Sequence, residues 1–132
     1  MISIKRDILN QIIVHAKSEL PNEACGYLAG SERAVTSGYH LTNIDHSPEH
    51  FSFDPAEQFK TLKDARSKGL QILANYHSHP ETPSRPSQED IRLAFDPDIS
   101  YIIISLAEAE PVVKSFRIVN GSATNEELII TD

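Results

Sequence analysis

Apolar residues in three segments of the chain recur every three to four positions, the spacing that places them on one face of a helix. The pattern predicts helices over residues 5–19, 55–68 and 87–95. Pro21 follows the first segment and Asp96-Pro97 follows the third, and proline interrupts helical hydrogen bonding. Asp54 is a good cap for the second helix, which Gly69 ends.

Other segments are apolar over shorter runs bounded by turn residues, which is typical of strands. The predicted strands cover residues 24–30, 34–44, 70–76, 100–106, 111–119 and 126–131. Residues 100–106 are apolar on both faces, so this strand is expected to be central. Asn120-Gly121 is a turn signal that should join the last two strands. The sequence therefore predicts one α+β domain over residues 1–132, with a mixed sheet and about three helices.

Composition narrows the function classes. The 132 residues include 12 Lys and Arg against 19 Asp and Glu, a net charge of −7, and no basic cluster that would bind nucleic acid. Cys25 is the only cysteine, which excludes an internal disulfide and a thiolate zinc site. No apolar run approaches the roughly 20 residues of a membrane span, and no signal peptide is visible. We therefore expect a cytoplasmic protein, with its oligomeric state left open.

His77-Ser78-His79 is the strongest candidate for chemistry. On an extended segment alternate side chains share a face, so the two imidazoles would stand about 6.5 Å apart at Cα. Asp90 follows after a proline-rich loop and offers a third ligand. Three protein ligands with a fourth position left for water are typical of a catalytic zinc site. A chance histidine pair would be an equal alternative if the pair stood alone.

Ser87 and Asp90 also have a structural interpretation. A serine followed three residues later by a carboxylate resembles a capping box at a helix start. The two interpretations are compatible, because capping would fix the Asp90 side chain and aim it at the histidines. Ser87 could then face the metal-bound water or a developing oxyanion.

A hydrolytic zinc site also needs a carboxylate that accepts and returns a proton. Glu23 is the candidate because it directly precedes a predicted buried strand. A surface glutamate at that junction is the simpler interpretation from its position alone. Glu49, Glu81 and Glu89 compete on similar grounds.

Together, Glu23, His77-Ser78-His79 and Ser87-x-x-Asp90 resemble the JAMM motif of MPN-domain metalloproteases, without a gap and over nearly the whole chain. The resemblance implies an MPN domain of the cytidine deaminase-like type, with a mixed, curved sheet. It also implies one zinc ion. By position, His77, His79 and Asp90 would be the zinc ligands, Glu23 the general acid/base and Ser87 the transition-state stabiliser.

The substrate class follows only from the same resemblance. The family cleaves amide bonds after the C-terminal glycine of ubiquitin or ubiquitin-like proteins. This short chain is similar to the small prokaryotic type, whose substrates include β-grasp sulfur-carrier proteins ending in Gly-Gly. The leaving group, whether an amino acid, an adduct or a lysine side chain, stays open.

Several alternatives remain at the level of sequence. Cys25 could be a nucleophile, although a lone cysteine is more often a small buried hydrophobe. His15, His40, His46 and His50 lack partner spacing and are expected to be surface or loop residues. His46 and His50, near Phe51 and Phe53, could line a groove for a substrate tail. A non-cleaving scaffold module and a zinc hydrolase or lyase of small molecules are the alternative functions.

Overall fold

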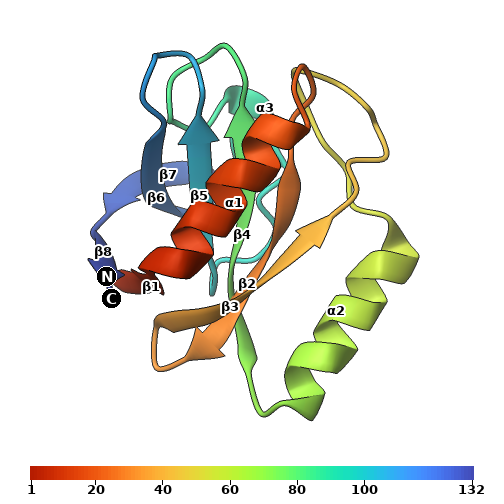
Figure 1. Cartoon of the computed structure of the whole chain (residues 1–132), viewed down its shortest axis with the longest axis vertical. Coiled ribbons are helices and arrows are strands. Elements are labelled where there is room, and N and C mark those ends of the chain that lie inside the picture. Colours follow the sequence, from red (N-terminus) through yellow and green to blue (C-terminus); the bar gives the residue numbers. More distant parts are fainter.

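The computed structural model describes all residues 1–132 as a single eight-stranded sheet with three helices (Figure 1). The strands are β1 (Ile2–Lys5), β2 (Cys25–Ser31), β3 (Ala34–Leu41), β4 (Gln71–His79), β5 (Ser100–Ser105), β6 (Val112–Val119), β7 (Ser122–Glu126) and β8 (Leu128–Thr131). The helices are α1 (Arg6–Ser18), α2 (Pro55–Ser67) and α3 (Gln88–Arg92). None of them is long and apolar enough to cross a bilayer. The predicted α+β class is confirmed.

The strand order is β7-β6-β5-β4-β2-β3-β1-β8, with parallel and antiparallel pairs in one sheet. β5 lies inside the sheet and all six of its residues are buried, as predicted for a central strand. β7 and β8 form the two edges, yet Glu127 alone separates them in sequence. The sheet must therefore curve until its edges approach each other, and Figure 1 shows β7 and β8 on the same side of the molecule.

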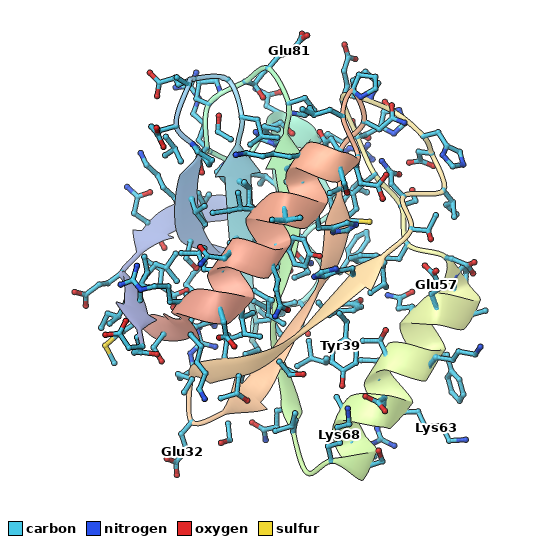
Figure 2. All side chains as sticks on the ribbon, viewed as in Figure 1. Glu32, Tyr39, Glu57, Lys63, Lys68 and Glu81 are labelled. Carbon is cyan, nitrogen blue, oxygen red and sulfur yellow. The ribbon has the colours of Figure 1, made fainter.

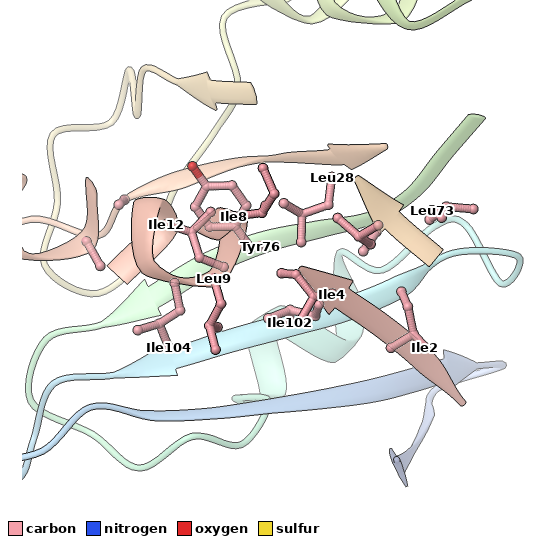
Figure 3. Close-up of a cluster of buried hydrophobic side chains, with 14 residues drawn as sticks. Ile2, Ile4, Ile8, Leu9, Ile12, Leu28, Leu73, Tyr76, Ile102 and Ile104 are labelled. Carbon is pink, nitrogen blue, oxygen red and sulfur yellow. The ribbon is translucent and has the colours of Figure 1, made fainter. Parts of the chain in front are cut away.

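The main core lies between α1 and the sheet (Figure 3). Ile8, Leu9 and Ile12 of α1 pack against apolar side chains of the strands, including Ile102 and Ile104 of β5. All five are less than about a tenth exposed. The helical spacing in residues 5–19 therefore indicated the correct buried face. α1 begins at Arg6 and ends at Ser18, within one residue of the prediction.

The other face of the sheet is only partly covered by α2, which stands apart from α1 (Figure 1). Thr61 and Ala65 are its only buried residues. Hydrogen bonds attach the helix instead: Tyr39 donates to Asp64 at 2.6 Å, and Gln58 donates to Tyr27 at 2.7 Å. Figure 2 shows Tyr39 lying between β3 and α2. Because α2 buries little surface, much of this face of the sheet is not covered by a helix.

Two strands, β1 and β7, were not predicted from the sequence. No strand was predicted before the first helix, but Ile2 and Ile4 are buried in β1, which pairs in parallel with β3 and β8. Four residues are too short for a period of two to stand out. The Asn120-Gly121 turn is present, with φ values of 52° and 77°. Its partner strand is the polar β7, however, whereas β8 pairs with β1.

Three further boundaries differ from the predictions. The strand predicted over residues 34–44 ends at Leu41, and the strand predicted over 70–76 continues to His79. The third helix ends at Arg92 rather than at residue 95, and Phe95 is 82% exposed. The apolar Phe95 that extended the helical pattern belongs to the wall of a cleft and not to a buried helix face.

A buried carboxylate links distant parts of the sheet. The Glu126 side chain is 4% exposed and accepts hydrogen bonds from Arg33 at 2.9 Å, from Ser115 at 2.9 Å and from Ser100. Burial alone would raise the pKa of Glu126. The serine hydrogen bonds and the Arg33 charge outweigh burial, so the pKa lies below its ordinary value.

We expect Glu126→Gln to lower the free energy of unfolding by about 2 kcal/mol at pH 7, since it removes a charged partner of Arg33. A lowered pKa stabilises the fold above the ordinary glutamate value and loses that contribution as the pH falls through the folded-state pKa. The difference from wild type should therefore shrink below about pH 4.5. Urea unfolding at several pH values, with the exposed Glu127→Gln as control, measures this. Identical unfolding midpoints at pH 7 would contradict the role of Glu126.

Candidate metal centre

His77 and His79 lie at the end of β4 on the face opposite α1. Side chains alternate across a strand, so Tyr76 packs in the core under α1 while His77 faces the other way. Pairing with β2 and β5 keeps β4 extended to His79, which is why the strand does not end at Tyr76. Both histidines are buried, at 3% and 4% exposure. The predicted placement of two imidazoles on one face is confirmed.

Asp90 is aimed by the start of α3. Ser87 is the N-cap, its Oγ accepts the Asp90 amide at 3.0 Å, and the Ser87 amide donates to Asp90 Oδ2 at 2.9 Å. The capping box inferred from the sequence is therefore present. It directs the same carboxylate oxygen toward the histidines, as expected from the sequence.

Three potential ligand atoms converge at this point. His77 Nε2 and His79 Nε2 are 3.1 Å apart, and Asp90 Oδ2 lies 3.2 Å and 3.1 Å from them. Tetrahedral ligands at typical zinc distances of 2.0–2.1 Å stand about 3.3 Å from one another. These three residues form a group compatible with one metal ion.

The orientation of His79 strengthens this interpretation. Its Nδ1 is 2.9 Å from the Pro83 carbonyl, an acceptor only, so Nδ1 carries a proton. In the neutral ring Nε2 then presents a lone pair to the Asp90 carboxylate. Two electron-rich atoms at 3.1 Å repel each other unless a proton or a cation lies between them. The Pro83 carbonyl thus takes the position of the outer partner that commonly fixes a metal-binding histidine.

The titration of the site follows from the same contacts. Burial alone would lower the pKa of His79, but hydrogen bonds with Asp90 and Pro83 outweigh it and raise the pKa. Burial alone would raise the pKa of Asp90, but hydrogen bonds with His77 and His79 hold it well below its ordinary value. The carboxylate is therefore ionised at neutral pH and ready to bind a cation.

Glu23 is buried, with 3% exposure, in the loop before β2. Burial raises its pKa to about 8, an effect opposed by the charge of His79 and reinforced by that of Asp90. Its Oε1 has no hydrogen-bond partner. The competing candidates Glu49, Glu81 and Glu89 are all exposed. Glu23 therefore has the environment of a proton-transfer group, and its competitors do not.

The backbone around Glu23 is tied to β4 between the two histidines. Ser78 Oγ accepts the Ala24 amide at 2.8 Å, and the Ser78 amide donates to the Ala24 carbonyl at 3.0 Å. On the other side the Glu23 carbonyl accepts Asn43 Nδ2 at 3.0 Å. Ser78, the middle residue of the His-x-His segment, therefore fixes where Glu23 sits. Glu23 itself lies two residues before Cys25, where β2 begins.

A cleft of about 580 Å³ begins at His77 and Asp90 and covers the sheet face that α2 leaves free. Phe51 stacks on His77, with ring centroids 4.7 Å apart, and lines this cleft together with His50. His46 does not line it. The expectation that this loop borders a groove holds for His50, whose Nδ1 lies 2.9 Å from Asp45, and not for His46.

His15 is half-buried and differs from the surface position expected for it, whereas His40 is exposed, as expected. His15 Nδ1 is hydrogen-bonded to the Tyr76 hydroxyl at 2.8 Å, and its ring stacks on His40 at a centroid distance of 4.6 Å. Burial lowers the pKa of both histidines. They lie on the α1 side of the sheet and do not join the candidate metal centre.

Cys25 is fully buried, in a small cluster with Tyr27 and Leu41. Burial raises the pKa of its thiol to about 12, so the thiolate needed for attack is disfavoured. The structure supports the interpretation of Cys25 as a small hydrophobe and opposes the nucleophile alternative.

We expect Cys25 to react with a thiol reagent only after unfolding, because native burial denies access to the sulfur. Labelling followed by mass spectrometry, with and without urea, measures this. Cys25→Ala should retain bound metal and activity. Loss of activity with the metal still bound would return the nucleophile mechanism to consideration.

Sequence reasoning missed two residues that shape the site. The Pro83 carbonyl orients His79, and Phe51 covers His77. Neither carries a sequence signal, since a backbone carbonyl can orient a ligand from any residue type. The prolines of the loop between His79 and Ser87 predict only that this loop is rigid.

The profile of the family described as "Prokaryotic homologs of the JAB domain" matches residues 5–119. The chain belongs to this family. The resemblance to JAMM-motif MPN-domain proteins inferred from the sequence is thereby confirmed.

Two relatives of this JAB-family chain carry functional names. The CysO-cysteine peptidase of Mycobacterium tuberculosis is 33% identical over 135 residues, covering 100% of this chain and 92% of the relative. A desampylase of Haloferax volcanii is 33% identical over 111 residues, covering 79% of this chain and 80% of the relative.

Solved structures agree on the fold. The solution structure of a Desulfitobacterium hafniense protein is 50% identical, with a TM-score of 0.93, and covers 100% of this chain and 94% of the other. A crystal structure of a JAB1/MPN domain protein from Archaeoglobus fulgidus is 25% identical, with a TM-score of 0.66 and coverage of 98% and 97%. The MPN-type fold expected from the resemblance is confirmed.

Proposed function

We propose that this protein is a zinc-dependent peptidase that hydrolyses the amide bond after the C-terminal Gly-Gly of a ubiquitin-like or sulfur-carrier protein. The observation that carries the proposal is the convergence of His77, His79 and Asp90 ligand atoms within 3.2 Å, in a chain whose Glu23 carboxyl is buried. The names of two relatives support the reaction class: a CysO-cysteine peptidase matched over 92% of its length and a desampylase matched over 80% of its length.

His77, His79 and Asp90 would hold the zinc ion, with Nε2, Nε2 and Oδ2 as the ligand atoms. Two neutral imidazoles and one carboxylate suit zinc better than magnesium or calcium, which prefer oxygen ligands. When bound, zinc polarises a carbonyl and lowers the pKa of a water molecule to about 7. The rest of the chemistry falls to side chains of this chain.

Glu23 would hold the proton during the reaction. A group that titrates near neutral pH can accept a proton from the attacking water and return it to the leaving nitrogen. Burial raises the pKa of Glu23 to about 8, which brings it into this range. Its Oε1 has no partner within the protein and is free to receive the proton.

Ser87 would stabilise the charge that develops on the carbonyl oxygen. Its Oγ already accepts the Asp90 amide, which leaves the hydroxyl hydrogen available for donation outward. The residue is exposed at the start of α3, next to the ligand carboxylate. A hydroxyl held by a cap is pre-oriented, and oriented donors lower the barrier most effectively.

In this function, residues 1–132 act as one catalytic domain in the cytoplasm on a β-grasp partner protein, without nucleic acid or membrane. The cleft volume of about 580 Å³ lies in the range of peptide and small-molecule sites alike. A non-cleaving scaffold module and a small-molecule hydrolase are therefore outcomes that the experiment must separate.

The test is intact-mass measurement of a C-terminally extended Gly-Gly carrier protein after incubation with the zinc-loaded enzyme. A mass loss matching a cut directly after Gly-Gly is expected, and it should disappear with a chelator. Zinc binding without cleavage of any extended or lysine-linked carrier would instead favour the scaffold or small-molecule alternatives.

A further inference from the structure

Asn75 lies on the floor of the cleft, on the same strand face as His77 and His79. Its side-chain Oδ1 is buried without a hydrogen-bond partner. Buried amide oxygens are nearly always paired, so an unpaired one in a native structure requires an explanation. No hydrogen bond joins this oxygen to the two tyrosines directly opposite Asn75, Tyr27 and Tyr101. Their hydroxyls are hydrogen-bonded to Gln58 and to the Asp96 backbone, respectively.

The walls around this amide are apolar and are continuous with the candidate metal centre. They include Phe51, Phe53, Ile72, Leu93 and Phe95. His77 and Asp90 form the end of the cleft nearest the metal. A ligand that extends from the candidate metal centre along the cleft passes Asn75, whose Oδ1 has no hydrogen-bond partner within the protein.

The position of Glu23 indicates which half of the substrate lies there. Glu23 does not line the cleft, whereas His77 and Asp90 do. The group that returns a proton to the leaving amine must lie beside that amine. The leaving group therefore departs on the Glu23 side, and the acyl half, the tail that ends in Gly-Gly, occupies the cleft.

The spacing of residues along β4 indicates which residue of the substrate tail lies level with Asn75. Asn75 precedes His77 by two residues, so their Cα atoms are separated by roughly 6.6 Å along β4. An extended peptide advances the same distance over two residues. If the last glycine of the tail has its carbonyl at the metal, the residue level with Asn75 is the one before the Gly-Gly pair.

We propose that Asn75 is a positioning residue for the substrate tail, and that its side-chain amide hydrogen-bonds the backbone of the residue preceding Gly-Gly. An asparagine amide can accept from a peptide N–H and donate to a peptide C=O at once. It therefore holds an extended backbone independently of the side chain that the residue carries. This inference rests on the proposed function and names a determinant of tail binding within the same site.

Asn75→Leu keeps the shape of the side chain and removes both hydrogen bonds. We expect KM for an extended Gly-Gly carrier to rise about tenfold with kcat nearly unchanged, since the contact is made equally in the ground and transition states. Thermal stability should be equal to or higher than wild type, because an unpaired buried oxygen is removed. A purely structural role predicts lower stability instead. Asn10→Leu, an exposed asparagine on α1, is the matched control.

A second measurement locates the contact on the substrate. In synthetic tail peptides, the amide N–H at each of the last three residues is replaced in turn by an ester oxygen. With the wild-type protein, the replacement at the residue before Gly-Gly should weaken turnover several-fold. With Asn75→Leu it should cause no further loss, which is the signature of a direct pair in a double-mutant cycle. Additive losses at all three positions would overturn the proposal.

Binding of the cleaved product separates this inference from the proposed function. A peptide ending in Gly-Gly, added to the zinc-loaded, 15N-labelled protein, should shift the side-chain amide signals of Asn75 and leave those of Asn10 unchanged. Saturable binding without a shift at Asn75, or no binding at millimolar peptide, would refute the role of Asn75. Absence of cleavage with a clear shift at Asn75 would instead overturn the peptidase assignment while supporting tail binding.

Discussion

Glu23→Gln is expected to leave zinc bound and to lower the turnover number at least about a hundredfold, the lower range for loss of a general acid–base group. Glutamine has the shape of glutamate but cannot accept and return a proton. The proposed ligand atoms belong to His77, His79 and Asp90, so metal content should stay near one ion per chain. Metal analysis and single-turnover kinetics on the same preparation measure both quantities.

The matched control for this substitution is Glu49→Gln. Glu49 is an equal candidate from the sequence but is exposed, so its replacement should leave turnover near the wild-type value. Near-wild-type turnover in Glu23→Gln would remove Glu23 from the mechanism. Loss of zinc in that variant would show that Glu23 supports the metal rather than the proton.

The same variant has a predictable effect on stability once the metal is removed with a chelator. Burial raises the pKa of Glu23 to about 8, so the folded state favours the protonated carboxyl. This contribution is fully present below the ordinary glutamate pKa and is lost as the pH rises through about 8. Metal-free Glu23→Gln should therefore be more stable than metal-free wild type at pH 9. A tenfold difference in proton affinity between the folded and unfolded states corresponds to about 1.4 kcal/mol, so the gain should exceed roughly 1 kcal/mol. Urea unfolding measures it, and the two proteins should converge near pH 4.

Asp90→Ala is expected to abolish stoichiometric zinc binding and, with it, all measurable cleavage. It removes the only negatively charged member of the three-ligand group and leaves two neutral imidazoles. The carboxylate is ionised throughout the neutral range, because hydrogen bonds with His77 and His79 hold its pKa far below the ordinary value despite burial. Metal content after dialysis against buffered zinc measures the loss.

Two controls separate loss of the ligand from loss of the α3 cap. Glu89→Ala removes an exposed carboxylate from the adjacent position and should retain zinc. Ser87→Ala removes the cap on the Asp90 amide, at a cost of about 1 kcal/mol, and should also retain zinc while turnover falls. Full zinc occupancy in Asp90→Ala would show that the ligand assignment is wrong.

The features that the sequence alone could predict have one physical basis in common. Each depends on interactions between residues that are close together along the chain. His77 and His79 share a face because any strand alternates its side chains. Ser87 and Asp90 form a capping box because helix starts leave amides unsatisfied within one turn. The amphipathic spacing that places Ile8 and Ile12 in the core is equally local.

Contacts between distant segments required the tertiary structure. From its position in the sequence alone, Glu23 is one of four glutamates that could equally be the proton-transfer group. Only the resemblance to the JAMM motif distinguishes it in the sequence. Its burial distinguishes it physically, and its loop is held by Ser78, more than fifty residues away. The environment that suits Glu23 to proton transfer therefore comes from folding.

The edges of the sheet show the same division. β1 has only four residues and carries little strand signal alone; in the structure Ile2–Lys5 pairs with Leu128–Thr131 from the other end of the chain. The Asn120-Gly121 turn was predicted from its two residues. The polar strand β7 that follows the turn and pairs with β6 was not predicted. Sequence by itself thus predicted the candidate ligand set and its local geometry. The tertiary structure decided the buried carboxyl, the orientation of His79 by Pro83 and the cleft over Asn75, because each depends on contacts that no local pattern encodes.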